Sequence, residues 1–136
     1  MTDTIPAGFE PITNAGNFST MIGPTWQRRE DDGSLTFGLM VEEKHLNGRG
    51  VVHGGMLMSF MDQLLGRTAH NLIGRKPTAT VQLDNQFLAS VREGDWIEGR
   101  GAVERETRSL LFVTGRLTVR GKTVLLSSGV WKILGQ

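Results

Sequence analysis

The hydrophobic pattern of the chain singles out one long apolar segment. From Gly54 or Gly55 to about Ile73 there is no proline, and apolar residues occur at almost every position around the helical turn. This pattern predicts a long helix that is apolar on most of its sides. Such a helix must be enclosed by the rest of the protein, because its surface is too hydrophobic to face water.

Four segments after this helix have the alternating pattern of β-strands, and turn residues separate them. They span residues 77–90, 95–106, 109–120 and 123–134. Alternation is clearest in the third segment, where Leu111 and Val113 fall on one face and Thr114 and Arg116 on the other. We therefore expect a sheet that is buried on one side.

Glycines inside three of the predicted strands indicate that this sheet is curved. Gly101, Gly115 and Gly129 interrupt the strand pattern, and glycine within a strand commonly marks a bend or the close approach of another part of the chain. The sequence thus predicts an α+β arrangement, in which a long central helix is wrapped by a curved antiparallel β-sheet.

The residues before the helix predict a hairpin and a loop. Residues 26–41 have the pattern of two short strands that turn at the Asp-Asp-Gly-Ser sequence of residues 31–34. Residues 45–50 contain two glycines and an asparagine, which predicts a loop. We expect one domain over residues 1–136, in which residues 1–22 form a lead-in segment.

The composition excludes several classes of function. The chain has 38% hydrophobic residues and a formal net charge of +1, which argues against nucleic acid as a partner. The absence of cysteine excludes disulfides, a cysteine nucleophile and a thiolate zinc site. His45, His53 and His70 do not have the spacing of a compact metal site, so we expect neither a metal nor a cofactor.

The chain also gives no signal for export or for a membrane span. Its first residues lack a basic start followed by an apolar run, so a cytoplasmic location is expected. Polar residues such as Asp62 and Arg67 interrupt the apolar helix, which makes it a poor membrane span.

Two features of the predicted helix point to a reaction centre. The sequence His53-Gly54-Gly55 stands at the helix start, where the first backbone N–H groups lack partners and would stabilise a carbonyl oxygen that acquires charge. Asp62 lies in the middle of the apolar helix, where an unpaired carboxylate is costly to bury. In a largely dry site, this carboxylate would attack a carbonyl carbon itself or take a proton from an attacking water.

The spacing of these features bears on assembly. Gly54 and Asp62 are eight residues apart, which is about 12 Å along a helix axis, so one helix cannot bring both to one carbon atom. Two antiparallel copies of the helix, related by a two-fold axis, would place Gly54 of one near Asp62 of the other. We therefore expect an obligate homodimer with active sites between the subunits.

Each of these residues also has a structural explanation. Asp62 is explained equally well as a structural carboxylate with hydrogen-bond partners in the protein, or as a residue on a helix face other than the buried one. His53 is explained as a histidine whose ring bonds to the backbone. The methionines at 56, 58 and 61 fit plain core filling as well as an adaptable acyl pocket. The presence of His53-Gly54-Gly55 at the right offset from Asp62 favours a functional site.

The order of Asn47, then His53-Gly54-Gly55, then Asp62 resembles the hotdog-fold acyl-CoA thioesterases of the phenylacetyl-CoA type. The resemblance covers roughly residues 20–134. It implies that Asp62 is the nucleophile or the general base and that the amide of Gly54 is the oxyanion donor.

The resemblance also implies roles for residues around this pair. Asn47 and His53 would orient the thioester and shape the loop, and Thr80 would hold the attacking water. The pantetheine arm of an acyl-CoA substrate would enter between the subunits of a dimer, and such dimers usually form homotetramers. Surface cations would meet the coenzyme A phosphates, for which the candidates are Arg105, Arg108 and Arg116.

The substrate pocket is expected along the helix. Gly55 lets a substrate come close to the helix start. The length of the acyl pocket depends on how four side chains pack across the dimer, namely Met58, Phe60, Met61 and Phe87. Neither the acyl group nor the choice between nucleophilic attack and water activation follows from the sequence.

Two other functions are compatible with the same fold. One is a noncatalytic acyl-CoA or lipid-binding module that keeps the pocket, and the other is a hotdog dehydratase. Relatives of the dehydratase type usually use a histidine as the base, whereas here the acid Asp62 follows His53-Gly54-Gly55 in the helix. The sequence therefore favours thioester hydrolysis.

Overall fold

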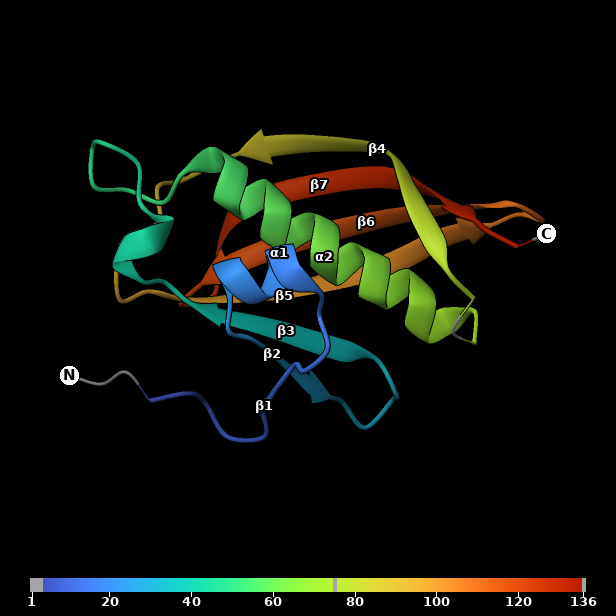
Figure 1. Cartoon of the computed structure of the whole chain (residues 1–136), viewed down its shortest axis with the longest axis horizontal. Coiled ribbons are helices and arrows are strands. Elements are labelled where there is room, and N and C mark those ends of the chain that lie inside the picture. Colours follow the sequence, from blue (N-terminus) through green and yellow to red (C-terminus); the bar gives the residue numbers. More distant parts are fainter. Residues whose placement is uncertain (1–3, 75, 136) are drawn as a thin grey trace.

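The computed structural model describes residues 4–74 and 76–135, in which one antiparallel sheet curves around one long helix (Figure 1). The helix is α2 (Gly54–Leu72). The strands are β1 (Glu10–Pro11), β2 (Thr25–Arg29), β3 (Leu35–Met40), β4 (Thr78–Phe87), β5 (Trp96–Glu106), β6 (Leu110–Val119) and β7 (Lys122–Ile133). A short helix α1 (Asn17–Ile22) and a 3-10 turn (Glu43–His45) complete the described elements.

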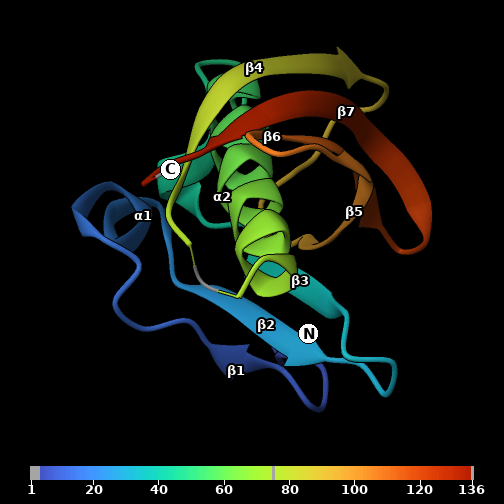
Figure 2. The same cartoon turned by 90° about the vertical axis from the view of Figure 1, so that its right-hand side faces the viewer.

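The strand order in the sheet is β1-β2-β3-β5-β6-β7-β4, and all neighbouring strands are antiparallel. After α2 the chain continues into β4, which pairs with β7 and forms the edge of the sheet opposite β1 (Figure 2). The second edge of β4 has no strand against it among the described residues.

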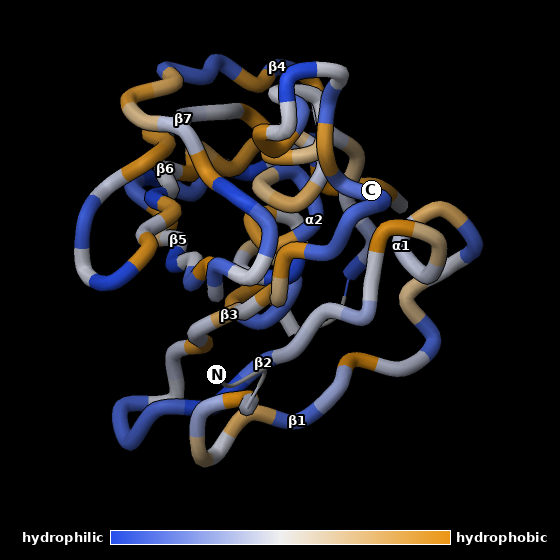
Figure 3. The backbone as a smooth tube through the Cα atoms, turned by 90° about the vertical axis from the view of Figure 1, so that its left-hand side faces the viewer, coloured by the Kyte–Doolittle hydropathy of each residue, from blue (hydrophilic) through white to orange (hydrophobic). Residues whose placement is uncertain are grey.

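The core lies between α2 and the concave face of the sheet. The helix buries Met56, Leu57, Phe60, Met61, Leu64, Leu65 and Ala69. In β5, β6 and β7, buried residues alternate with more exposed ones, whereas β4 has no buried residue. Hydrophobic and hydrophilic stretches follow one another along the chain (Figure 3). This alternation confirms that one face of the sheet is buried, because successive side chains point to opposite faces.

The glycines in the strands allow the helix to lie close to the sheet. A Cβ atom on Gly101 would lie 2.7 Å from the side chain of Leu65, and one on Gly115 would lie 2.7 Å from both Leu65 and Met61. A Cβ on Gly129 would lie 2.6 Å from the carbonyl oxygen of Gln82. The predicted close approach is confirmed at all three positions.

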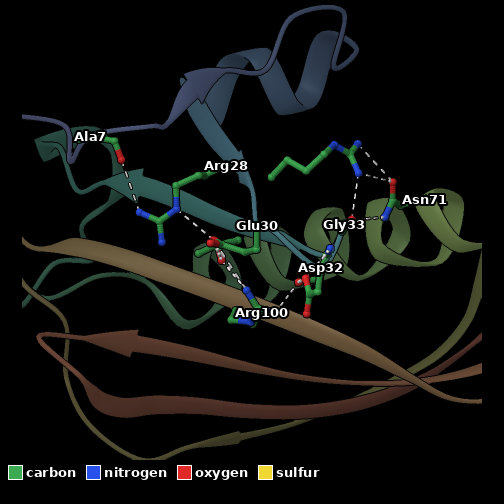
Figure 4. Close-up of polar contacts among 10 residues, drawn as sticks. Ala7, Arg28, Glu30, Asp32, Gly33, Asn71 and Arg100 are labelled. Carbon is green, nitrogen blue, oxygen red and sulfur yellow. Dashed lines mark hydrogen bonds and ion pairs between the residues drawn. The ribbon is translucent and has the colours of Figure 1, made fainter.

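A polar network fixes the β2–β3 hairpin on the convex face (Figure 4). Arg28 pairs with Glu30 at 3.0 Å, and Arg100 lies 3.9 Å from the same carboxylate. The Thr36 hydroxyl donates to Glu30 at 2.6 Å, and this bond together with Arg28 holds the pKa of Glu30 below its ordinary value. The hairpin is thus held by charges that have partners.

The structure confirms the predicted helix, hairpin, loop and four long strands, and it differs from expectation in two respects. The lead-in segment contains β1 and α1, and β1 joins the sheet beside β2. The helix is also less enclosed than predicted, because the side that bears Asp62, Gln63 and Arg67 is only half-buried. Within the described residues, no helix combines the length and the apolar character needed to span a membrane.

Candidate active site

The start of α2 is built by a histidine cap. His53 precedes the helix, and its Nδ1 atom accepts a hydrogen bond from the amide of Gly55 at 2.8 Å. A Cβ on Gly55 would lie 2.9 Å from Nδ1 of His53, so this close cap needs glycine there. The amides of Met56 and Leu57 donate to the carbonyl of His53.

The cap leaves one amide of the first turn free. Among the described residues, no acceptor meets the backbone N–H of Gly54. This amide lies at the positive end of the helix dipole, where it can donate to an oxygen that carries negative charge. The ring of Phe87 lies beside it, with its Cε1 atom 3.4 Å from where a Cβ of Gly54 would stand.

The loop before the helix is held by Asn47 and His45. The side-chain oxygen of Asn47 accepts from the amides of Arg49 at 2.8 Å and Val51 at 3.3 Å, so this residue shapes the loop. The buried ring of His45 accepts from the amide of Glu42 at Nδ1 and lies 2.7 Å from the carbonyl of Ile22 at Nε2. Nε2 therefore carries the proton that this carbonyl accepts.

Asp62 lies beside Thr80 of β4. The hydroxyl of Thr80 donates to Oδ1 of Asp62 at 2.7 Å, although the two residues are 18 positions apart in the chain. A bulge in β4 makes this contact possible: Thr80 pairs with Trp131 and Gln82 with Val130, so Val81 is an extra residue. The bulge turns Thr80 toward the helix and Gln82 to the other face.

Asp62 opens onto a hollow of about 490 Å³ and is half-buried. The helix contributes Asp62, Gln63, Gly66, Arg67 and His70 to its wall, and the remaining lining residues are Asn14, Ala15, Pro77, Thr78, Thr80 and Trp131. The expectation that Asp62 lies in a dry, apolar setting is therefore not met within one chain. Its face of the helix points away from the core.

The expected acyl-pocket residues fall into two groups. Met58 and Phe87 are partly exposed, at 39% and 50% of their surface, and are available to a ligand or a second chain. Phe60 and Met61 are buried at 1% and 0% exposure, and Met61 packs at Gly115. Phe60 and Met61 belong to the core of the chain, so their place in an acyl pocket stays a prediction.

The proposed cations Arg105 and Arg108 are exposed but do not line the hollow at Asp62. Arg105 lies at the end of β5 and Arg108 in the turn before β6, at the end of the sheet opposite the start of α2 (Figure 1). Arg116 lies on β6, where it donates to Thr123. The structure thus brings together Asp62 and Thr80, but not the three arginines.

Several residues of the hollow were missed by the sequence analysis. Gln63, Arg67 and His70 follow Asp62 at spacings that place them along one side of a helix, which is a signal that the sequence contained. Asn14 and Ala15 reach the hollow only through the path of the N-terminal segment. No pattern in the sequence indicates that contact.

Comparison with known proteins shows the family to which the chain belongs. The model of the thioesterase superfamily matches residues 49–125, which include the start of α2, Asp62 and Thr80. "Putative esterase PA0474" of Pseudomonas aeruginosa is 31% identical over 130 residues, covering 95% of this chain and 97% of the relative. Human acyl-coenzyme A thioesterase 13 is 22% identical over 129 residues, covering 95% and 92% of the two chains.

A solved structure supports the same placement. The phenylacetic acid degradation-related protein of Ralstonia eutropha JMP134 has a TM-score of 0.77 and 25% sequence identity, covering 91% of this chain and 92% of that one. The predicted hotdog fold and the likeness to thioesterases of the phenylacetyl-CoA type are confirmed.

Proposed function

The chain belongs to the thioesterase superfamily and is a thioester hydrolase, and from this premise we propose that it cleaves acyl-CoA thioesters with Asp62 as the catalytic carboxylate. The observation that carries the proposal is the contact of Asp62 with Thr80 beside a hollow large enough for an acyl group. The coenzyme A part of the substrate is supported by the name of human acyl-coenzyme A thioesterase 13.

The active site is proposed to lie between two chains. Gly54 and Asp62 are both in α2, about 12 Å apart along its axis, so neither chain brings its own pair to one thioester. The free edge of β4 supports a dimer, because an open strand edge is a template for pairing with another strand. Exposed Val81, Phe87 and Leu88 lie on or next to that edge, at 61%, 50% and 53% exposure.

A two-fold axis at this edge would complete the site. It would pair β4 with β4 of the partner and place the two copies of α2 antiparallel, so that the amide of the partner's Gly54 approaches Asp62. The same contact would cover Met58 and shield Asp62 from water. Homotetramers would then form from such dimers.

The proposed reaction uses the groups at these two helix positions. The thioester oxygen accepts from the Gly54 amide as negative charge develops on it. Asp62 takes a proton from a water that attacks the carbonyl carbon, or attacks this carbon itself to form an anhydride that water then cleaves. The C–S bond breaks, the sulfur leaves as the thiolate of coenzyme A and is protonated, and the acyl group becomes a carboxylic acid.

Thr80, His53 and Asn47 position these groups. The Thr80 hydroxyl fixes one carboxylate oxygen of Asp62 and leaves the other for water or substrate. His53 holds the helix start, so that the Gly54 amide stays free. Asn47 holds the loop through its oxygen, and its NH₂ group is then available to the thioester.

The proposal is tested by thiol release from a panel of acyl-CoAs, measured with a thiol-reactive dye. Asp62→Asn keeps the shape and the acceptor for Thr80 but removes the base, so turnover should fall by about 10²- to 10⁴-fold. The matched control is Asp84→Asn. Asp84 lies in β4 and does not line the hollow at Asp62, so this variant should keep wild-type activity. Turnover that persists in Asp62→Asn would exclude this residue from the mechanism.

The shared site is tested by mixing inactive chains. An Asp62→Asn chain and a Gly54→Pro chain, once combined, form dimers in which one of the two sites has both groups intact. Random mixing should restore about a quarter of the wild-type activity per chain. Absence of recovery, with mixed dimers confirmed by native mass spectrometry, would contradict a site made by two chains.

A further inference from the structure

The hollow beside Asp62 carries a second charged group that the proposed reaction does not use. Arg67 lines this hollow five residues after Asp62, about 7.5 Å further along the helix axis. Pro77 and Trp131 contribute apolar surface to the same wall. The hollow therefore offers a carboxylate, an apolar surface and a guanidinium to one ligand.

Arg67 has no partner of its own within residues 4–74 and 76–135. No carboxylate oxygen lies within 4.0 Å of its guanidinium, and it makes no hydrogen bond. The helix provides no acid three or four residues away on either side, where the residues are Gln63, Leu64, His70 and Asn71.

Partial burial makes this lack of a partner significant. Burial lowers the pKa of the Arg67 guanidinium, yet an arginine stays charged at neutral pH. A cation that loses part of its hydration without gaining a counter-ion raises the free energy of the folded protein. An anionic ligand group would remove this cost.

The surroundings of Arg67 are also cationic. Arg67 and His70 line an adjoining hollow together with Arg29, and no acidic residue of the described chain lines it. Arg29 is held there by the carbonyl of Gly33 at 2.9 Å and by Asn71 at 3.4 Å (Figure 4). Positive charge thus accumulates on the side of Arg67, whereas Asp62 would repel a second negative charge placed near it.

We propose, on the basis of the proposed function, that the enzyme prefers acyl groups that end in a free carboxylate and that Arg67 binds this carboxylate. The substrates would be coenzyme A monothioesters of dicarboxylic acids. A guanidinium binds a carboxylate through two parallel hydrogen bonds, which fixes the orientation of the acyl chain as well as its charge. The distance of about 7.5 Å between Asp62 and Arg67 along the helix axis corresponds to roughly six bonds of an extended acyl chain.

The inference is tested with two substrates of equal length, adipyl-CoA and hexanoyl-CoA. The wild type should have a kcat/KM for adipyl-CoA at least about tenfold above that for hexanoyl-CoA, because a hydrogen-bonded charge pair contributes this much or more. Arg67→Met keeps an unbranched apolar stem without the charged guanidinium and should abolish this preference, mainly through the KM for adipyl-CoA. Arg67→Lys should restore part of it.

The control is Lys132→Met, which removes one positive charge from an exposed position of β7 outside the hollow and should leave the ratio of the two kcat/KM values unchanged. The inference is overturned if the wild type hydrolyses hexanoyl-CoA as well as adipyl-CoA, or if Arg67→Met changes both substrates by the same factor. No hydrolysis of any acyl-CoA by the wild type would instead overturn the proposed function and this inference together. The wild-type ratio tests the inference even if a variant fails to fold.

Discussion

Charged side chains are paired in the β2–β3 hairpin and unpaired on the outward side of α2. In the hairpin, Glu30 meets Arg28 and Arg100, and all three lie on the convex face of the sheet. On α2, Asp62 and Arg67 line one hollow, and neither forms an ion pair within the described chain. This contrast agrees with the two proposals, in which Asp62 and Arg67 serve a ligand, whereas the charges of the hairpin stabilise the fold.

The largest expected effect separates activity from stability at Asp62. Asp62→Asn should lower kcat by about 10²- to 10⁴-fold, because it removes the base or nucleophile. The free energy of unfolding should change by less than about 0.5 kcal/mol, because the half-buried amide still accepts from Thr80. Urea unfolding beside a steady-state assay measures both, and a large loss of stability would make Asp62 a structural carboxylate.

A second effect concerns the free amide of Gly54. Gly54→Pro removes this N–H at a helix position where proline is well tolerated, and the extended backbone of His53 suits a following proline. We expect kcat to fall by about 10²- to 10³-fold, as for the loss of one oxyanion donor. Gly54→Ala keeps the amide and needs only a small movement of Phe87, so its kcat should stay near that of the wild type.

Equal losses in the alanine and proline variants of Gly54 would show that space at the helix start matters and that the amide does not. Circular dichroism of both variants, measured before the assays, establishes that α2 still forms.

A smaller effect is expected at Thr80. Thr80→Val keeps the shape of the side chain and removes the hydrogen bond to Asp62, which contributes about 1.5 kcal/mol or more when the acceptor is charged. We therefore expect kcat to fall by roughly tenfold. Thr80→Ser keeps the hydroxyl donor and should retain the wild-type kcat. An unchanged kcat in Thr80→Val would contradict the positioning role.

The smallest effect is expected in the hairpin. The pKa of Glu30 is lowered in the folded state, so its stabilising contribution is present above the ordinary value of 4.5 and is lost as the pH falls through the lower folded value. Glu30→Gln should thus lower the Tm slightly at pH 7, and the difference should vanish in acid. Thioester hydrolysis should not change. A loss of activity in this variant would show that the two groups of charges are coupled.

The sequence predicted the elements that have strong periodicity. The helix and the four long strands are long enough for their patterns to be distinguished, and turn residues mark their ends. A strand of two residues and a helix of six residues are too short for such a pattern, so β1 and α1 were not predicted.

The candidate site was predicted less completely, for reasons of packing. The hydrophobic pattern of α2 does not reveal which side faces the sheet, so it did not show that Phe60 and Met61 fill the core. The resemblance to known thioesterases suggested Thr80, but its contact with Asp62 depends on a bulge that no sequence pattern shows. Arg67 gains its position in the hollow only when β4 and the N-terminal segment fold beside α2.

The bulge in β4 makes the register of this strand a requirement of the proposed active site. Val81 contacts neither Asp62 nor the hollow, and its side chain is 61% exposed, so many other residues would serve in its place. If Val81 instead paired with Trp131 in a regular ladder, Thr80 would pair with Lys132, and the side chains of Thr78, Ala79 and Thr80 would each change face. The hydroxyl of Thr80 would point to the convex surface, and the enzyme would lose it without any change in the identity of a single site residue.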